Sequence, residues 1–175
     1  MGGMFLESSD RRMHPLPLHL RPAEAADQAF FLALYRSTRT DLLSLLADPR
    51  YIDALIATQQ QSQLAGFRSS HPDALYQVMA LDGTAVGRLV TALVGGALRV
   101  VDIAVLPPAR GRGVAGETLR RQQAQAASDG RDLTLAVRRD NAGARRLYAA
   151  LGFAVVEEDA FKLQLRWRCP AAGTA

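Results

Sequence analysis

A short loop with the sequence R-G-R-G-V-A, which begins at Arg110, has the residue types that bind an anion. Gly111 and Gly113 lack a Cβ atom, so the backbone there can adopt positive φ and turn its N–H groups toward a ligand. The guanidinium groups of Arg110 and Arg112 add full positive charge and fork-shaped donors. A helix that begins near Val114 would add the partial positive charge of its N-terminus. The loop therefore suits a pyrophosphate better than a neutral ligand.

The glycine spacing alone does not identify the ligand. Gly111, Gly113 and Gly116 also spell the G-x-G-x-x-G pattern of dinucleotide-binding folds. In those folds a strand runs directly into the first glycine near the start of the domain, whereas here two prolines, an alanine and an arginine intervene. A Walker loop would need a lysine after its second glycine, and this sequence has none there. Both nucleotide-binding motifs are therefore disfavoured.

Asn141 and Tyr148 form a second group of polar side chains that could act on one ligand. They lie seven positions apart in a segment with helical spacing of apolar residues. Seven residues are about two helical turns, so the two side chains share a face with a rise of about 10 Å between them. One extended ligand could contact both.

The two motifs together resemble those of the GNAT superfamily of N-acetyltransferases. The run R-G-R-G-V-A resembles the acyl-CoA signature R/Q-x-x-G-x-G/A, with Ala115 in place of the final glycine. The run N-A-G-A-R-R-L-Y-A-A-L-G-F, which begins at Asn141, resembles the second signature, N-x-x-A-x-x-x-Y followed by x-x-L-G-F. The motifs occur in the expected order, about thirty residues apart. The resemblance spans residues 18–167, and its distinctive residues lie between Val100 and Phe153.

The resemblance implies transfer of an acetyl group from acetyl-CoA directly to a primary amine, either a small molecule or a peptide. It implies that the pantetheine arm of CoA pairs with the fourth strand where that strand parts from the fifth. The Val105 N–H would also donate to the thioester oxygen as negative charge develops there. The residues implied to bind the cofactor are Ile103, Val105, Arg110, Gly111, Arg112, Gly113, Val114, Ala115 and Asn141.

Three further roles follow from the chemistry of that transfer. The leaving thiolate needs a proton, and Tyr148 is the candidate general acid, with a buried core tyrosine as the alternative. The attacking amine must lose a proton, and Asp102 is the candidate for handling it. A carboxylate in an apolar strand is also explained by a structural ion pair, and both interpretations stay open. The resemblance also implies that helices in the first part of the chain form one wall of the acceptor site. The candidate substrate contacts on them are Tyr35, Arg39 and Asp41, and the alternative for each is a helix cap or a surface ion pair.

The element pattern predicts an α/β (α+β) domain with the GNAT acyl-CoA N-acyltransferase fold. We expect a mixed, mostly antiparallel central sheet of six to seven strands, with helices on both faces and a splayed fourth and fifth strand pair. Asp-Gly and Gly-Gly turns separate the second, third and fourth strands. The expected strands are 18–21, 74–81, 84–94, 97–106, 133–137, 153–157 and 161–167. The first expected helix begins at Pro22, three more occupy 41–46, 51–66 and 114–127, and the last begins near Asn141. Asp48-Pro49 is expected to interrupt the chain between helices 41–46 and 51–66.

Length and composition indicate one globular domain. The chain has 175 residues, 49% of them hydrophobic, and a net charge of +4. We expect a flexible leader over residues 1–17, a single domain over 18–168 and a short tail over 169–175. The only cysteine, Cys169, excludes an intrachain disulfide. Three scattered histidines do not suggest a metal site.

Composition also limits the partners and the location. No apolar run reaches the roughly 20 residues of a membrane span, and the N-terminus lacks the apolar region of an export signal, so we expect a cytoplasmic protein. The arginines are dispersed, which disfavours nucleic acid as a partner. The closing hairpin has an edge that a second copy could pair with, giving a homodimer. A CoA-binding sensor or scaffold module without turnover is the alternative function.

Overall fold

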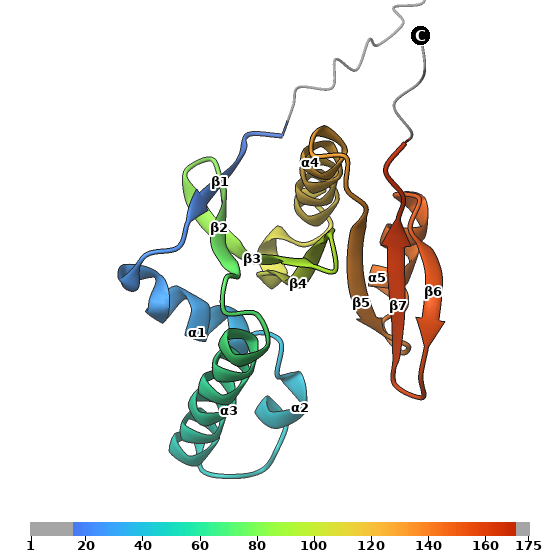
Figure 1. The fold of residues 1–175 in the computed structure, drawn as a ribbon. Helices are drawn as coiled ribbons and strands as arrows, with labels where there is room; N and C mark the ends of the chain where they lie inside the picture. The colour runs from blue at the N-terminus through green and yellow to red at the C-terminus, as the bar shows by residue number, and fades with distance from the viewer. Residues whose placement is uncertain (1–15, 171–175) are drawn as a thin grey trace, which may run out of the picture.

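The computed structural model describes residues 16–170 and has a seven-stranded sheet in the order β1-β2-β3-β4-β5-β7-β6 (Figure 1). All neighbouring strands pair antiparallel except β4 and β5, which are parallel. The strands are β1 (Leu18–Pro22), β2 (Leu75–Leu81), β3 (Thr84–Val94), β4 (Ala97–Val105), β5 (Leu133–Arg138), β6 (Ala154–Glu158) and β7 (Lys162–Trp167). The α-helices are α1 (Gln28–Arg36), α2 (Thr40–Leu43), α3 (Pro49–Ser70), α4 (Val114–Ser128) and α5 (Ala142–Ala150). The predicted fold class is confirmed.

Helices cover both faces of the sheet, as its side chains show. Arg88 of β3 points to the face covered by α1, where its guanidinium carbon lies 5.6 Å from the ring centre of Phe31. The neighbouring position, Gly87, pairs with Met79 of β2. Met79 points to the opposite face, because adjacent residues of a strand alternate in direction. There its sulfur lies 3.1 Å from the hydroxyl of Thr118, on α4.

The two tight turns that join β2 to β3 and β3 to β4 match the predicted turns. Asp82 and Gly83 both have positive φ, at 51° and 78°, and so do Gly95 and Gly96, at 55° and 82°. Two consecutive residues with positive φ are what a two-residue hairpin needs to match the twist of its strands. These turns fix the ends of β3, which begins and ends where the sequence predicted.

The first helix, α1, begins later in the chain than predicted. Pro22 ends β1 instead of opening a helix, and a 3-10 turn at Ala25–Asp27 comes before α1. Asp27 accepts two hydrogen bonds from the Arg21 guanidinium, at 2.7 and 2.8 Å, and one from the Glu24 backbone, which holds this connection in place. These bonds keep the pKa of Asp27 at about 2.

The connection between α2 and α3 also differs from the prediction. Helix α2 ends at Leu43, three residues earlier than expected. The predicted interruption at Asp48-Pro49 is instead the start of α3. The Asp48 carboxylate accepts a hydrogen bond from the Arg50 N–H at 2.8 Å, and proline is tolerated in the first turn because that turn needs no N–H donor.

Strand β4 leaves its parallel neighbour after a short pairing. The β4–β5 pairs are Leu98 with Leu133, Arg99 with Thr134 and Val100 with Leu135, and then pairing stops. At the same place β4 contains a bulge, since Val100 lies opposite Thr91 while Asp102 lies opposite Val90. The second half of β4 therefore turns away from β5, which confirms the predicted splay.

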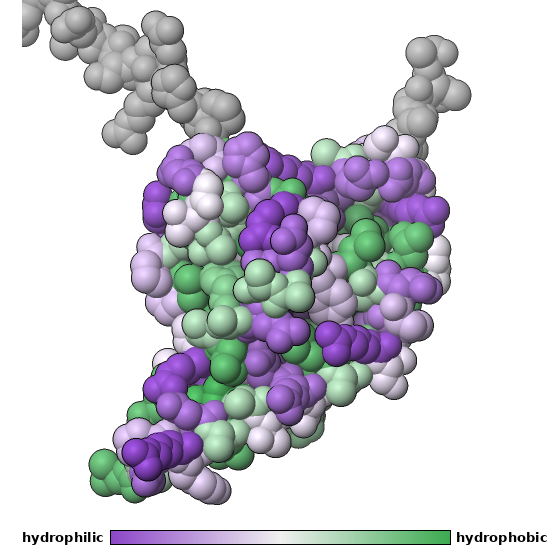
Figure 2. Space-filling model, turned by 90° about the vertical axis from the view of Figure 1, so that its left-hand side faces the viewer, coloured by the Kyte–Doolittle hydropathy of each residue, from purple (hydrophilic) through white to green (hydrophobic). Residues whose placement is uncertain are grey.

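The main buried cluster lies around β5, α4 and α5. Its fully buried members include Leu119 and Leu133. On the face formed by β1, β2, α1 and α3, hydrophilic and hydrophobic residues are interspersed (Figure 2). Within residues 16–170 no helix combines the length and the apolar character needed to cross a membrane.

The predicted leader and tail fall mostly outside the described residues. Only Leu16 and Pro17 of the leader, and Cys169 and Pro170 of the tail, are described. Cys169 is a half-buried free cysteine, and its backbone N–H donates to Asp132 at 2.9 Å.

Candidate functional site

A cleft of about 880 Å³ opens where β4 parts from β5. Its walls come from the second half of β4, the following loop, the first turns of α4 and α5, and the segment after α1. The volume lies within the range of sites that bind small molecules and cofactors. The lining residues are Ser37, Thr38, Thr40, Ile103, Ala104, Val105, Ala109, Arg110, Gly111, Gly113, Val114, Ala115, Gly116, Arg120, Asn141, Gly143, Ala144, Leu147 and Tyr148.

The backbone of β4 presents unpaired groups to this cleft. Leu106 donates its N–H to Val86 at 2.8 Å, so Leu106 and, by alternation, Ala104 bond toward β3. The N–H groups of Ile103 and Val105 therefore point to the opposite edge, where pairing with β5 has ended. The bulge at the middle of β4 produces this arrangement, because it reverses which residues face β5. An extended ligand can pair with this edge as an added strand would.

The glycine loop presents a row of backbone donors to the same cleft. Gly111 and Gly113 have φ of 72° and 84°, and a Cβ atom at either position would meet no atom within 4 Å. Within the described part of the chain, no protein group accepts a hydrogen bond from the N–H groups of residues 111–116. These donors lie at the N-terminus of the fifteen-residue helix α4. The loop therefore fits an anion such as a diphosphate.

The arginines of the loop differ in their positions. The Nε of Arg110 donates to the Val105 carbonyl at 2.8 Å, so this side chain folds over the end of β4 and lines the cleft. The Val105 carbonyl is thereby paired, whereas the Val105 N–H is not. Arg112 is exposed and does not line the cleft. Arg120, the seventh residue of α4, does line the cleft, and neither sequence motif includes it.

Asn141, the N-cap of α5, and Tyr148, within α5, both line the cleft. Asn141 caps the helix, since its Oδ1 accepts a hydrogen bond from the Ala144 N–H at 3.1 Å, and its amide donor group is left for a ligand. Tyr148 is 7% exposed and packs beside Phe153, with 5.9 Å between ring centres. Burial raises the pKa of the Tyr148 hydroxyl above its usual value, and the negative charge of Asp102 raises the pKa further.

Asp102 forms an ion pair with a buried arginine. Arg88 donates from Nε and Nη2 to Oδ2 of Asp102, at 3.0 and 2.8 Å. The side chain of Arg88 is 3% exposed and that of Asp102 is 20% exposed. The other carboxylate oxygen, Oδ1, takes no hydrogen bond from any described residue. The structure therefore contains the structural ion pair, and Asp102 is not among the residues that line the cleft.

The three candidate substrate contacts pair mainly with one another. Arg39 donates to both oxygens of Asp41, at 3.0 and 2.7 Å, and to the Tyr35 hydroxyl at 3.1 Å. Arg39 thereby keeps the pKa of Asp41 at about 2. None of the three lines the cleft, whereas the hydroxyl-bearing neighbours do, namely Ser37, Thr38 and Thr40. Nothing in the S-T-R-T segment distinguishes these residues from Arg39 before the packing of the helices is known.

Among the described residues, no group of three histidine, cysteine, aspartate or glutamate side chains gathers where it could hold a metal ion.

Comparisons with known proteins agree with this geometry. The model of the acetyltransferase (GNAT) family matches residues 31–153. The comparison with curated proteins gave no match.

Solved structures of similar fold include several acetyltransferases. The PaiA N-acetyltransferase of Thermoplasma acidophilum, solved with coenzyme A, is 16% identical, with a TM-score of 0.66 over 86% of this chain and 98% of that one. The ribosomal-protein-S18-alanine N-acetyltransferase of Escherichia coli is 17% identical, with a TM-score of 0.62 over 90% and 97%. YncA of Salmonella typhimurium, solved with acetyl-CoA, is 18% identical, with a TM-score of 0.56 over 90% and 97%. At these identities the likeness shows a shared fold.

Proposed function

We propose that this chain transfers an acetyl group from acetyl-CoA to a primary amine by direct attack in a ternary complex. The chain belongs to the GNAT family of acetyltransferases, which supports this proposal. One observation carries the proposal: the unpaired edge of β4, the anion-binding loop and the Tyr148 hydroxyl all face one cleft. A single CoA thioester could contact all three.

The residues of the cleft fit the parts of acetyl-CoA. The amides of residues 111–116 and the Arg110 guanidinium would bind the diphosphate. The β4 edge at Ile103 and Val105 would pair with the amides of the pantetheine arm, and the Asn141 amide would donate to the same arm. The Val105 N–H would also donate to the thioester oxygen as charge develops there.

In the proposed reaction the amine nitrogen forms a bond to the acetyl carbon, and the carbon–sulfur bond breaks. The amine loses a proton, and the departing thiolate gains one. Tyr148 would supply the proton to sulfur, because its raised pKa keeps the hydroxyl protonated at neutral pH. The acceptor amine is a small molecule or the amine of a peptide.

The test is amine-dependent release of the CoA thiol from acetyl-CoA. A panel of a peptide with a free N-terminus, lysine, a polyamine and an aminoglycoside covers the main classes of primary amine. We expect at least one class to accelerate thiol release above the rate without amine. If CoA binds in a calorimetric titration but no amine accelerates release, the chain is a sensor or scaffold module and the proposed activity is wrong.

The Gly113 position gives a prediction for the cofactor loop. Gly113→Ala would place a methyl group on a residue with φ of 84°, which costs an ordinary residue about 1–2 kcal/mol. We expect a folded protein whose affinity for CoA falls about tenfold, because the loop must shift its amides to relieve the strain. Titration calorimetry with CoA measures this change. The control is Gly66→Ala in α3, where φ is not positive and a Cβ atom meets nothing within 4 Å, and its affinity for CoA should not change.

A further inference from the structure

Arg120 of α4 lines the cleft, and the acetyl transfer proposed above gives it no role. A Cβ atom at Gly116, which also lines the cleft, would lie 3.8 Å from Nη1 of Arg120. The guanidinium therefore folds back over the first turn of α4, in the direction that helical side chains usually take. It lies at the end of the row of unpaired amides formed by residues 111–116.

The charge of Arg120 is only loosely paired with a carboxylate. Its Nη1 lies 3.8 Å from Oε2 of Glu117, which is too long for a hydrogen bond. The other oxygen of Glu117 accepts a hydrogen bond from Nε of Arg121 at 3.0 Å, so the charge of Glu117 is already paired. Among the described residues, none accepts a hydrogen bond from the Arg120 guanidinium. Its N–H donors are therefore available to a ligand in the cleft.

Arg110 and Arg120 are the two cations among the residues that line the cleft, and different elements hold them. Arg110 is fixed at the end of β4, since its Nε donates to the Val105 carbonyl at 2.8 Å. Arg120 lies where α4 approaches α5, because the Cβ position at Gly116 is also 3.5 Å from Cδ1 of Leu147. The cleft therefore has two separate places where a guanidinium can meet an anionic group.

Two glycines keep the walls formed by α4 and α5 open. Gly116 and Gly143 both line the cleft, and neither has positive φ. A Cβ atom at either position would meet no atom closer than 3.5 Å, so alanine would fit and would favour the helix more than glycine does. The backbone does not require glycine at these positions. Close approach of a ligand to both helices explains why side chains are lacking there.

CoA carries two separate anionic groups, a diphosphate and a phosphate monoester at the 3′ position of its ribose. In the proposed function the loop amides and Arg110 bind the diphosphate. A phosphate monoester carries nearly two negative charges at neutral pH, and a guanidinium can pair with it through two parallel hydrogen bonds. We infer, on the basis of the proposed function, that Arg120 pairs with the 3′-phosphate, so that the protein distinguishes CoA from dephospho-CoA.

The test compares the binding of CoA with that of dephospho-CoA, which lacks only the 3′-phosphate. Both are titrated into the full chain by calorimetry at one ionic strength. We expect CoA to bind about five- to tenfold more tightly, since the phosphate contact is bidentate but solvent screens a side chain that is 62% exposed. Equal affinities would overturn the inference and leave the proposed function intact. Failure of CoA to bind at all would reject both.

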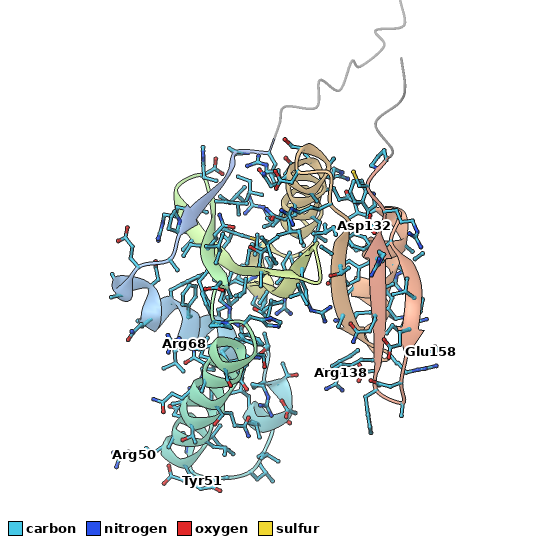
Figure 3. The ribbon with its side chains drawn as sticks, viewed as in Figure 1. Arg50, Tyr51, Arg68, Asp132, Arg138 and Glu158 are labelled. Atoms are coloured by element: carbon cyan, nitrogen blue, oxygen red, sulfur yellow. The ribbon has the colours of Figure 1, made fainter. Side chains whose placement is uncertain are left out.

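Two arginine variants localise the preference for CoA. Arg120→Gln should keep the wild-type Tm, lower the affinity for CoA about five- to tenfold and leave the affinity for dephospho-CoA within about twofold. Arg50→Gln removes the same charge from α3, and Figure 3, viewed as Figure 1, shows Arg50 at the lower end of α3, far below α4. This control should keep the full preference for CoA.

Two outcomes for these variants would contradict the inference. If Arg120→Gln weakened the binding of CoA and dephospho-CoA equally, Arg120 would act on the diphosphate or on the rest of the cofactor. If Arg120→Gln and Arg50→Gln reduced the preference for CoA equally, the preference would depend only on the overall charge of the protein.

Discussion

Tyr148→Phe is expected to lower kcat for acetyl transfer by about 10²–10³-fold while the affinity for CoA stays within about twofold. The phenyl ring keeps the packing of the buried side chain, including its contact with Phe153 at 5.9 Å between ring centres. Only the O–H group is removed, and that group is the proposed proton donor to the leaving thiolate. The expected loss therefore lies in the chemical step. Rates of thiol release at saturating acetyl-CoA and amine, together with a calorimetric titration of CoA, measure both quantities.

The pKa of Tyr148 adds a pH dependence to this prediction. Burial, and then the charge of Asp102, raise this pKa above the usual value of 10.0 in the folded state. A group with a raised folded-state pKa stabilises the fold at pH below its unfolded pKa, and this contribution is lost as the pH rises through the folded pKa. The wild-type chain should therefore lose stability above about pH 10 more steeply than Tyr148→Phe does, as denaturant titrations at several pH values would show.

Tyr51→Phe is the matched control, because Tyr51, on α3, is 63% exposed and does not line the cleft. This variant makes the same chemical change and should keep wild-type kcat. A Tyr148→Phe enzyme as fast as the control would remove Tyr148 from the chemistry and leave it a core residue.

The sequence predicted best the parts of the fold that short-range chemistry determines. Asp82-Gly83 and Gly95-Gly96 must adopt positive φ, so they located both ends of β3. The glycine loop and the start of α4 at Val114 were likewise predicted from the sequence, because glycines and helix-start signals determine the backbone over only a few residues. The spacing of Asn141 and Tyr148 predicted that one ligand could contact both, and both residues line the same cleft.

The features of the fold and the site that depend on strand register could not be predicted from the sequence. The bulge in β4 reverses the direction of its backbone groups, and nothing in the run V-V-D-I-A-V indicates it. The partner of Asp102 is Arg88, fourteen residues away, and only the antiparallel register of β3 and β4 brings the two together. The sequence also could not show that Thr40 lines the cleft while Arg39 does not, because this depends on how α1 and α2 pack against the sheet.

Asp102→Asn is expected to lower the free energy of unfolding by about 2–4 kcal/mol, because it leaves the Arg88 guanidinium without a countercharge. Arg88 is 3% exposed and donates twice to the carboxylate oxygen that becomes part of an amide. The remaining groups around the guanidinium supply no negative charge, since Nη2 also donates to the neutral Gln63 amide at 3.3 Å and Nη1 is buried without a partner. Urea denaturation of both proteins measures the difference.

A matched control separates burial from charge. Asp140→Asn breaks the ion pair with Arg138, whose Nη2 lies 2.6 Å from the carboxylate, but both side chains are exposed, at 66% and 73%. Solvent screens such a pair, so this variant should change the free energy of unfolding by less than about 1 kcal/mol. Equal losses for the two variants would contradict the view that the buried position of Arg88 sets the cost.

Kinetics of Asp102→Asn then decide whether this carboxylate also handles the acceptor. A purely structural ion pair predicts that the variant, assayed well below its Tm, keeps the KM for the amine and loses only stability. A carboxylate whose Oδ1 contacts the ammonium group predicts a KM for the amine raised about tenfold or more, since the charge-assisted contact is lost, with the KM for acetyl-CoA unchanged. Because Asp102 pairs with the buried Arg88 and does not line the cleft, the geometry favours the first result. An unchanged KM for the amine would restrict Asp102 to its pairing with Arg88.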